Sequence, residues 1–328
     1  MKFFIWQIIL LTGLNTIAMS QRFPTPGIRN QAISPSISKQ TFLYAVKDSN
    51  KLGLDVYMMK NTDTPAKKPC VIFVFGGAFV TGDRDDSVYN GYFNFLAEHG
   101  YIVVSISYRL GLKGVRHVSK FSIKPLVNAL NMAIDDVFDA TNWVINHSAE
   151  LGIDSSEILL SGSSSGAITV LTAEFEKANE YEAAAKIPAA FHYAGLITFS
   201  GAILSLKGKL RFKNPPAPRL MFHGTADQIV PYKKIKFFNR GFYGSSWIAK
   251  TLAGNHYPYF LYSEEGMGHE IAVYPMYYNL NDIRFFLEKY IAQHKSYQIS
   301  LNFKDPDKKP VMLETPDELM KKLNPSPE

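Results

Sequence analysis

The sequence predicts an α/β fold in which a mostly parallel central sheet has helices on both faces. Short apolar runs, such as residues 158–160, alternate with longer segments of helical periodicity, and most runs are apolar throughout. Strands that are apolar on both sides are buried on both faces of a sheet, and their alternation with helices is typical of parallel sheets. The chain of 328 residues is 46% hydrophobic, which is enough for one large domain.

The elements are expected in one catalytic domain at residues 41–300, after an extended, proline-containing lead-in at 21–40. The first two strands, 41–46 and 54–58, flank turn residues that predict an antiparallel hairpin. Residues 301–328 are charged and proline-punctuated, so we expect a loosely ordered tail. Apolar residues at helical spacing predict helices between 130 and 145 and between 283 and 291. The expected parallel strands are 70–75, 101–107, 158–160, 196–200, 220–222 and 259–262.

The first 20 residues differ from the rest of the chain. Lys2 precedes an apolar run at 3–11, and Ala18 and Ser20 are small residues where a signal peptidase would cut. Polar residues interrupt the stretch, whereas a membrane span needs about 20 apolar residues. We therefore expect a cleavable signal peptide at 1–20, cut near Ser20/Gln21, and a secreted or periplasmic protein. A retained anchor is the alternative.

The cysteine and charge content excludes an intrachain disulfide and speaks against a nucleic-acid-binding protein. Cys70 is the only cysteine, so no intrachain disulfide can form, and its apolar run predicts a small buried side chain. The net charge is +6, but the Lys and Arg residues do not form the basic stripe with interleaved aromatic residues that is typical of a nucleic-acid-binding protein. A basic run from Lys207 to Lys213 is expected to be a solvated loop face, with contact to an anionic substrate as the alternative.

The strongest candidate for chemistry is the stretch Gly162-Ser163-Ser164-Ser165-Gly166, directly after the apolar run 158–160. A strand followed by G-x-S-x-G predicts a sharp, cramped turn that lifts Ser164 above the sheet edge. The pattern alone also occurs in ordinary loops. A serine nucleophile needs a histidine to accept its proton and a carboxylate to orient that histidine, so the partners decide the assignment.

Asp227 is the candidate carboxylate. It follows the predicted strand 220–222, and the loop after the preceding strand, 201–218, contains no Asp or Glu. Taken alone, Asp227 could equally be a turn or helix N-cap residue.

His269 is the candidate base, because it follows the last predicted strand in Gly-Met-Gly-His. His223 and His256 are the rivals. We expect His223 to hydrogen-bond the acid loop and His256 to pack or to lie on the surface.

The oxyanion donors are expected at Gly76 and Gly77, after the strand 70–75, and at the amide of Ser165. No Gly-Lys-Ser/Thr follows these glycines, so they do not indicate a phosphate-binding loop.

Phe79, Ser163 and Trp247 are candidate substrate-pocket residues, although aromatic residues at helical spacing more often belong to a core. Acidic residues and histidines do not cluster at metal-ligand spacings, so we expect neither a metal nor a cofactor.

The chain resembles the α/β-hydrolase superfamily over about residues 40–295, because Ser164, Asp227 and His269 follow that family's order. It is similar to secreted bacterial carboxylesterases, including acetyl- and feruloyl-esterase-like members, in its Gly-Gly-Ala-Phe loop, in Tyr108-Arg109-Leu110 and in His-Gly-x-x-Asp.

Two positions depart from the hormone-sensitive-lipase-like pattern: Phe75 replaces a histidine, and Ser163 replaces an acidic residue. The loop 201–218 is too short for a large cap domain, and an open cleft suits bulky or polymer-attached esters.

The resemblance implies an exported serine hydrolase that cleaves carboxylic esters, small or linked to a polysaccharide, through an acyl-enzyme intermediate. We expect neither nucleic-acid binding nor a stable membrane span. One alternative is a serine peptidase similar to the prolyl-oligopeptidase catalytic domain. Another is a non-catalytic binding protein that keeps the hydrolase fold.

Overall fold

The computed structural model describes residues 31–60, 66–113, 123–237 and 240–311, apart from the side chain of Phe237. The expected signal peptide and its cut site lie outside these residues. The central sheet has nine strands: β1 (Ile37–Lys47), β2 (Asn50–Met59), β3 (Lys68–Val74), β4 (Ile102–Ile106), β5 (Ile153–Ser163), β6 (Gly195–Phe199), β8 (Arg219–Gly224), β11 (Tyr259–Glu264) and β12 (Gln298–Phe303).

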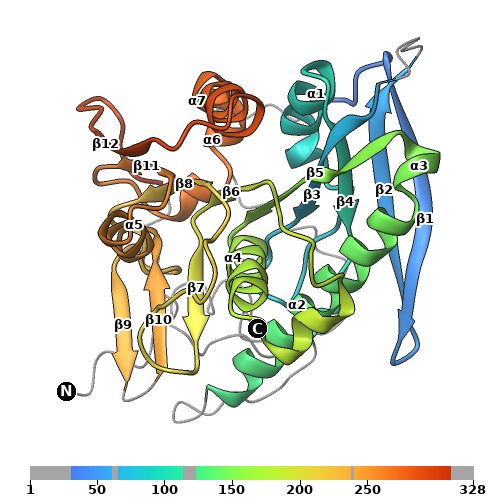
Figure 1. Ribbon diagram of the computed structural model, residues 1–328. Helices are drawn as coiled ribbons and strands as arrows, with labels where there is room; N and C mark the ends of the chain where they lie inside the picture. Colours follow the sequence, from blue (N-terminus) through green and yellow to red (C-terminus); the bar gives the residue numbers. More distant parts are fainter. Residues whose placement is uncertain (1–30, 61–65, 114–122, 238–239, 312–328) are drawn as a thin grey trace, which may run out of the picture.

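The strand order is β1-β2-β4-β3-β5-β6-β8-β11-β12 (Figure 1). Strand β2 is antiparallel to both of its neighbours, and all other neighbouring strands are parallel. The carboxyl ends of β3, β5, β8 and β11 therefore meet at one edge of the sheet, where ligands bind in folds of this kind.

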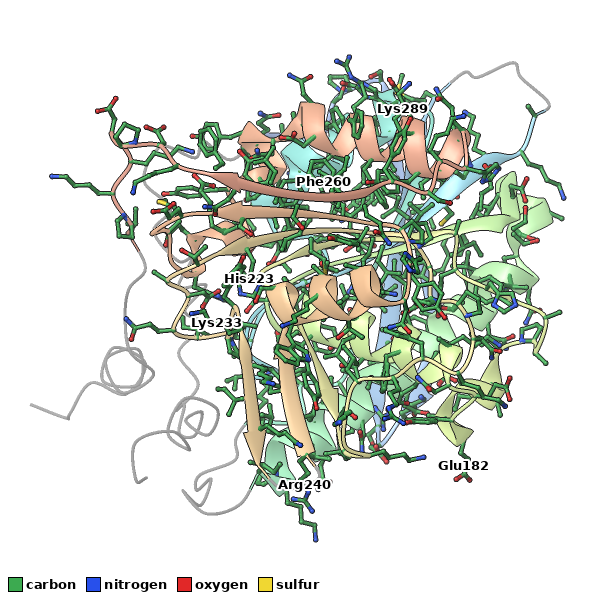
Figure 2. All side chains as sticks on the ribbon, turned by 60° about the vertical axis from the view of Figure 1, so that its left-hand side comes forward. Glu182, His223, Lys233, Arg240, Phe260 and Lys289 are labelled. Carbon is green, nitrogen blue, oxygen red and sulfur yellow. The ribbon has the colours of Figure 1, made fainter. Side chains whose placement is uncertain are left out.

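Helices cover both faces of the sheet, as the sequence predicts. The helices α1 and α7 lie on one face, and α2, α4 and α5 lie on the other (Figures 1 and 2). The α-helices are α1 (Asn90–Glu98), α2 (Lys124–Asn146), α3 (Ser148–Leu151), α4 (Ser165–Ala178), α5 (Ser245–Gly254), α6 (Pro275–Tyr278) and α7 (Leu280–Phe286). Shorter turns are the 3₁₀ helices η2 (Ser87–Tyr89), η3 (Glu182–Lys186) and η4 (His269–Ala272) and the π-helical turn η5 (Leu287–Ala292).

The N-terminal hairpin forms as predicted, but it is longer than expected. Strand β1 begins at Ile37, inside the stretch assigned to the extended lead-in. The turn places Asp48 at φ 48° and Ser49 at φ 66°. Positive φ at both central residues is the geometry of a two-residue hairpin turn that matches the twist of the strands.

The catalytic domain extends beyond residue 300, the C-terminal boundary that the sequence predicts for it. Strand β12 continues to Phe303 and pairs in parallel with β11, from Tyr259↔Gln298 to Glu264↔Phe303. Its side chains are mostly exposed because β12 is the edge strand, so its sequence lacks the continuous apolar run of a central strand.

A second, smaller sheet was not predicted. Strands β7 (Ala202–Ser205), β10 (Arg240–Gly244) and β9 (Lys234–Phe237) form an antiparallel sheet in that order. Only Ser200-Gly201 separates β7 from β6, so the two strands look like one apolar run followed by a loop. We call these three strands the small sheet.

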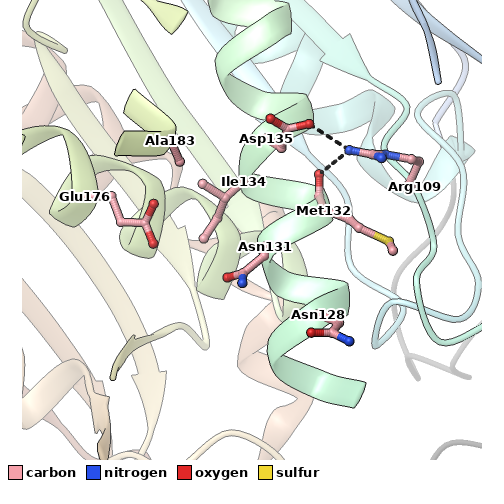
Figure 3. Close-up of a pocket in the computed structure, with 8 residues that line it drawn as sticks. All are labelled: Arg109, Asn128, Asn131, Met132, Ile134, Asp135, Glu176 and Ala183. Atoms are coloured by element: carbon pink, nitrogen blue, oxygen red, sulfur yellow. Dashed lines mark hydrogen bonds and ion pairs between the residues drawn. The ribbon is translucent and has the colours of Figure 1, made fainter. Parts of the chain in front are cut away.

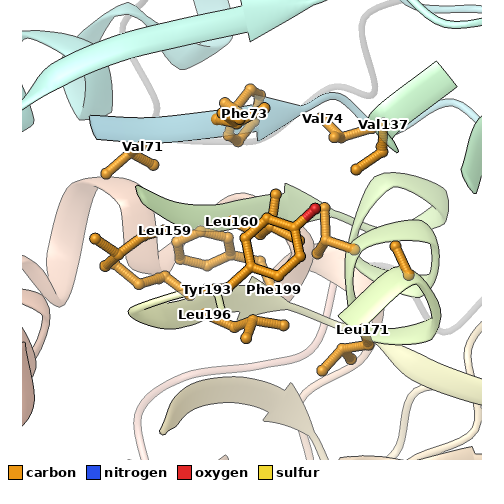
Figure 4. Packing of buried hydrophobic residues seen from close by; sticks show 14 of the residues in the cluster. Val71, Phe73, Val74, Val137, Leu159, Leu160, Leu171, Tyr193, Leu196 and Phe199 are labelled. Atoms are coloured by element: carbon orange, nitrogen blue, oxygen red, sulfur yellow. The ribbon is translucent and has the colours of Figure 1, made fainter. Parts of the chain in front are cut away.

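The core is densely packed around the central strands. Phe73 on β3, Leu160 on β5 and Phe199 on β6 are completely buried, and Figure 4 shows them between the sheet and its helices. Cys70 is also completely buried, as expected, and burial raises the pKa of its thiol far above the ordinary value. No helix in the described parts of the chain has both the length and the hydrophobicity needed to cross a membrane.

Candidate active site

The G-x-S-x-G stretch forms a sharp turn between β5 and α4. Ser164 has φ 51° and ψ −118°, a strained conformation for a non-glycine residue. A Cβ on Gly166 would lie 2.0 Å from the carbonyl oxygen of Val74, and a Cβ on Gly162 would lie 2.6 Å from the backbone of Gly166. Both positions therefore need glycine, and the turn presents Ser164 at the carboxyl edge of the sheet.

The structure brings Ser164, Asp227 and His269 together in one chain of hydrogen bonds. The Oγ atom of Ser164 lies 2.8 Å from Nε2 of His269, and Nδ1 of His269 lies 2.8 Å from Oδ2 of Asp227. A carboxylate can only accept, so Nδ1 carries the proton and donates it to Asp227. Nε2 is then free to accept the hydroxyl proton of Ser164, as a general base requires.

Asp227 is held as a buried carboxylate. Its Oδ1 accepts hydrogen bonds from the amides of Ile229 and Val230, each at 2.9 Å. Burial alone would raise the pKa of Asp227, but the charge of His269 and hydrogen bonds from His223 and His269 outweigh it and hold the pKa well below its usual range. The carboxylate therefore stays ionised beside His269.

His223 supports the acid, as predicted for this rival of His269. Its Nε2 lies 3.1 Å from the carbonyl oxygen of Val230 and 3.5 Å from Oδ2 of Asp227, and its Nδ1 lies 2.8 Å from Oγ of Ser245 at the start of α5. His223 is completely buried, and within the described residues it forms no hydrogen bond with Ser164. His223 therefore supports the loop that carries Asp227.

Of the three predicted oxyanion donors, only two are available. No hydrogen bond within the described residues occupies the amides of Gly77 and Ser165. The amide of Gly76 instead donates to the hydroxyl of Tyr89 at 3.1 Å. The prediction that Gly76 assists as a donor is therefore corrected.

Glycine is nevertheless required at this loop. A Cβ on Gly76 would lie 3.2 Å from the Cβ of Ser164, so the loop packs directly against Ser164. Gly77 has φ 123°, and a Cβ there would lie 2.0 Å from the carbonyl oxygen of Thr81. Ala78 also has a positive φ of 56°, so the loop follows a fixed and unusual path.

Two buried tyrosines that the sequence analysis missed hold this loop. Tyr89 accepts the Gly76 amide, and Tyr108 donates to the carbonyl of Phe75 at 3.1 Å. The Tyr108 hydroxyl also lies 3.4 Å from Oγ of Ser165, so it connects the two parts of the chain that carry the free amides. The sequence shows Tyr108 only as part of the family likeness, because its contacts to Phe75 and Ser165 span 33 and 57 residues of sequence.

Two of the three predicted pocket residues are buried inside the protein. Phe79 is 2% exposed and packs edge-on against Tyr108. Ser163 is also 2% exposed, and its Oγ donates to the carbonyl of Ala272 at 2.8 Å, which joins the turn to the loop carrying His269. The pocket prediction is therefore wrong for these two residues. Trp247 is half-buried on α5, and the ammonium of Lys234 lies 3.3 Å from the centre of its ring.

A cavity of about 460 Å³ lies elsewhere, between α2, α4 and η3 (Figure 3). None of Ser164, Asp227 and His269 lines it. Its lining residues are Arg109, Asn128, Asn131, Met132, Ile134, Asp135, Glu176 and Ala183.

Because Glu176 lines this cavity, we expect the free energy of unfolding of the protein to depend on pH. Burial raises its pKa to about 7, although Lys207 opposes the shift. A carboxyl with a raised folded pKa adds stability below its unfolded pKa of about 4.3 and loses it as the pH rises through 7. Because the group is partly exposed, we expect Glu176→Gln to gain about 1–2 kcal/mol of unfolding free energy relative to the native chain between pH 5 and pH 8.5. Urea denaturation at both pH values measures this.

The matched control is Glu182→Gln, which removes an exposed carboxylate that has no ion pair in the described structure. Its stability should follow the native chain at both pH values. Parallel curves for Glu176→Gln would contradict the raised pKa.

Asp135, Asp136 and Asp139 on α2 are the one group of acidic residues in the described parts of the chain whose oxygen atoms lie close enough together to hold a metal ion. Cations already neutralise it: Lys47 contacts all three aspartates, and Lys186 pairs with Asp135 and Asp139. The guanidinium of Arg109 lies 2.9 Å from Asp136. These contacts make it an ion-pair network between α2, β1 and η3.

Part of the sequence and the fold of this chain are similar to those of known proteins. The BD-FAE family model matches residues 54–203. Lipase 1 of Geotrichum candidum is 31% identical over 121 residues, which cover 36% of this chain and 21% of that protein. The para-nitrobenzyl esterase of Bacillus subtilis is 33% identical over 110 residues, covering 33% of this chain and 22% of that protein. The aligned part thus spans about a fifth of the length of these relatives.

Among solved structures, an esterase of Thermogutta terrifontis bound to propionate superposes with a TM-score of 0.56. It is 18% identical, and the match covers 78% of this chain and 94% of that one. The same esterase phosphorylated by paraoxon gives a TM-score of 0.55, at 19% identity and with 78% and 95% of the chains covered. These matches show that the chain has the fold of those esterases, with a mostly parallel sheet between layers of helices.

Proposed function

We propose that this chain, a member of the α/β-hydrolase superfamily, hydrolyses carboxylic esters through an acyl-enzyme intermediate on Ser164. The observation that carries the proposal is the pair of 2.8 Å contacts that join Ser164 to His269 and His269 to Asp227. Partial sequence likeness to a lipase and an esterase supports the same chemistry.

The geometry supports the following sequence of steps. Oγ of Ser164 attacks the ester carbonyl as Nε2 of His269 takes its proton, and the oxyanion accepts hydrogen bonds from the amides of Gly77 and Ser165. The tetrahedral intermediate collapses, and His269 returns the proton to the leaving alkoxide, so that the alcohol departs. Water then attacks the acyl group with His269 as base, which releases the acid and restores Ser164. Asp227 orients His269 and stabilises the imidazolium in both halves.

We further propose that the ester has a short acyl group and that the protein is exported. The propionate found in the structurally similar esterase supports the first point. The basic and apolar stretch at residues 1–20 supports the second.

An organophosphorus probe tests the function directly. Incubation with paraoxon should attach one phosphoryl group per chain to Ser164, and hydrolysis of p-nitrophenyl acetate should fall in proportion to the labelled fraction. Peptide mass spectrometry locates the label, with Ser163 and Ser165 as internal controls because both are buried. A fully labelled protein that still hydrolyses the ester would contradict the proposal.

The same assay separates an esterase from a peptidase. We expect p-nitroanilide amides to remain almost unhydrolysed. Turnover of the amide and the ester at similar rates would instead favour a peptidase.

A further inference from the structure

The positive charge of this chain is concentrated in one segment. Residues 201–262 contain ten Lys and Arg residues and a single acidic residue, Asp227, so the segment carries +9 while the whole chain carries +6. This segment includes the small sheet, its connecting loops and α5.

Only two of these ten cations have a carboxylate partner among the described residues. Lys213 pairs with Glu180, and buried Arg219 pairs with Glu174 at 2.8 Å. The others are exposed and have no ion pair in the described structure, and we call them the basic flank: Lys207, Lys209, Arg211, Lys233, Lys234, Lys236, Arg240 and Lys250. An uncompensated field of this kind attracts anions.

Part of the basic flank, Lys233 to Arg240, follows strands β9 and β10 of the small sheet and starts beside the loop that carries Asp227. The carbonyl of Lys233 accepts a hydrogen bond from the amide of Gly244, and the next residue, Ser245, contacts His223 behind Asp227. Figure 2 shows Lys233 near His223 and Arg240 at the far end of the small sheet. A track of separated cations fits a polymer with repeated negative charges better than one small anion.

The lack of exposed apolar side chains beside the basic flank makes a membrane surface an unsuitable binding partner. Of the large hydrophobic residues that are exposed in the described structure, only Leu206 lies in this segment. Stable binding at a lipid interface needs apolar area to bury as well as positive charge.

Nucleic acid is also disfavoured as the partner that binds the basic flank. Base recognition on single strands uses open aromatic faces, whereas Lys207 covers the ring of Tyr181 and Lys234 covers that of Trp247. A nucleic acid backbone would also offer no carboxylic ester to Ser164.

We propose that the basic flank binds a carboxylated polysaccharide and thereby holds an ester carried by that polymer next to Ser164. The inference rests on the proposed ester hydrolysis for its catalytic half, but binding of the polymer can be measured without turnover. The ester itself would be an acyl decoration on a chain of uronic acid units.

The test variant is Lys233→Gln combined with Lys236→Gln and Arg240→Gln, which leaves Lys234 over Trp247. Affinity electrophoresis and fluorescence titration measure binding to polygalacturonate. At low salt, we expect the affinity to fall about 10- to 100-fold, and binding by the native chain should weaken as salt rises from 20 to 200 mM. With partly acetylated polygalacturonate as substrate, the ratio of kcat/KM on the polymer to kcat/KM on p-nitrophenyl acetate should fall about 10-fold.

The matched control removes the same charge elsewhere, through Lys51→Gln, Lys67→Gln and Lys295→Gln. These three lysines are exposed and have no ion pair in the described parts of the chain. Their loss should change neither polymer binding nor the activity ratio by more than about twofold. Acetylated xylan, a neutral polymer, should show no salt-dependent binding to any variant.

The outcomes separate the alternatives. Equal loss in the test and control variants, or no loss in either, would overturn the proposal. Binding to vesicles containing phosphatidylserine or to DNA, without binding to polygalacturonate, would overturn it in favour of those partners. A native chain that binds polygalacturonate but does not hydrolyse p-nitrophenyl acetate would refute the proposed function while leaving the polymer site supported.

Discussion

Replacing Ser164 by alanine is expected to lower kcat for p-nitrophenyl acetate by roughly 10⁴-fold or more. Alanine cannot form the acyl-enzyme, and removal of the nucleophile leaves only the weak catalysis by the oxyanion hole and by binding. Within the described structure, the side chain of Ser164 hydrogen-bonds only to His269, so the fold should be retained. Stopped assays of the purified variant, with circular dichroism on the same sample, measure both quantities.

Ser296→Ala is the matched control, because Ser296 is exposed and lies far along the chain from the turn. It should keep full activity. A Ser164→Ala protein that retains more than about 1% of the native kcat would place the nucleophile elsewhere.

Replacing Asp227 by asparagine is expected to lower kcat by about 10³- to 10⁴-fold, with the shape of the site intact. Oδ1 of Asp227 already accepts the amides of Ile229 and Val230. An asparagine oxygen would keep those two bonds and turn its NH₂ group toward Nδ1 of His269. The imidazole would then have to carry its proton on Nε2, where it could no longer accept the proton of Ser164.

NMR of the imidazole nitrogens reports the tautomer, and steady-state kinetics reports the rate. Asp307→Asn removes an exposed carboxylate that has no ion pair in the described part of the chain, and it should behave like the native chain. Nearly native activity in Asp227→Asn would mean that Asp227 only anchors its loop. Because the pKa of Asp227 is held low, its titration should not limit activity near neutral pH.

The sequence predicts those features that local pattern determines. Continuous apolar runs identify the parallel strands, including β3 and β5, and the glycines around Ser164 identify the turn, because the clash that excludes a Cβ is local. The acid and base candidates follow from strand ends that share one sheet edge. The structure brings them within hydrogen-bonding distance of one another.

Contacts between distant segments could not be predicted in the same way. Whether the Gly76 amide is free depends on Tyr89, which lies in a 3₁₀ turn with no periodic pattern. Phe79 looks like a pocket residue beside an oxyanion loop, but the positive φ of 62° directs the chain so that its ring joins the core. The small sheet escaped detection because strands of four or five residues carry too little periodicity.

The spacing of the site along the chain has a consequence for biosynthesis. Ser164 and His269 are separated by 105 residues, and the strand before His269 pairs in parallel with both β8 and β12. Parallel pairing between distant segments is slow, because the intervening chain must be closed into loops first. On a growing polypeptide, Ser164 and His269 therefore cannot meet until the chain has been synthesised through β11 and β12 and these parallel strands have docked. Recovery of ester hydrolysis after dilution from denaturant would report the end of folding rather than the initial collapse.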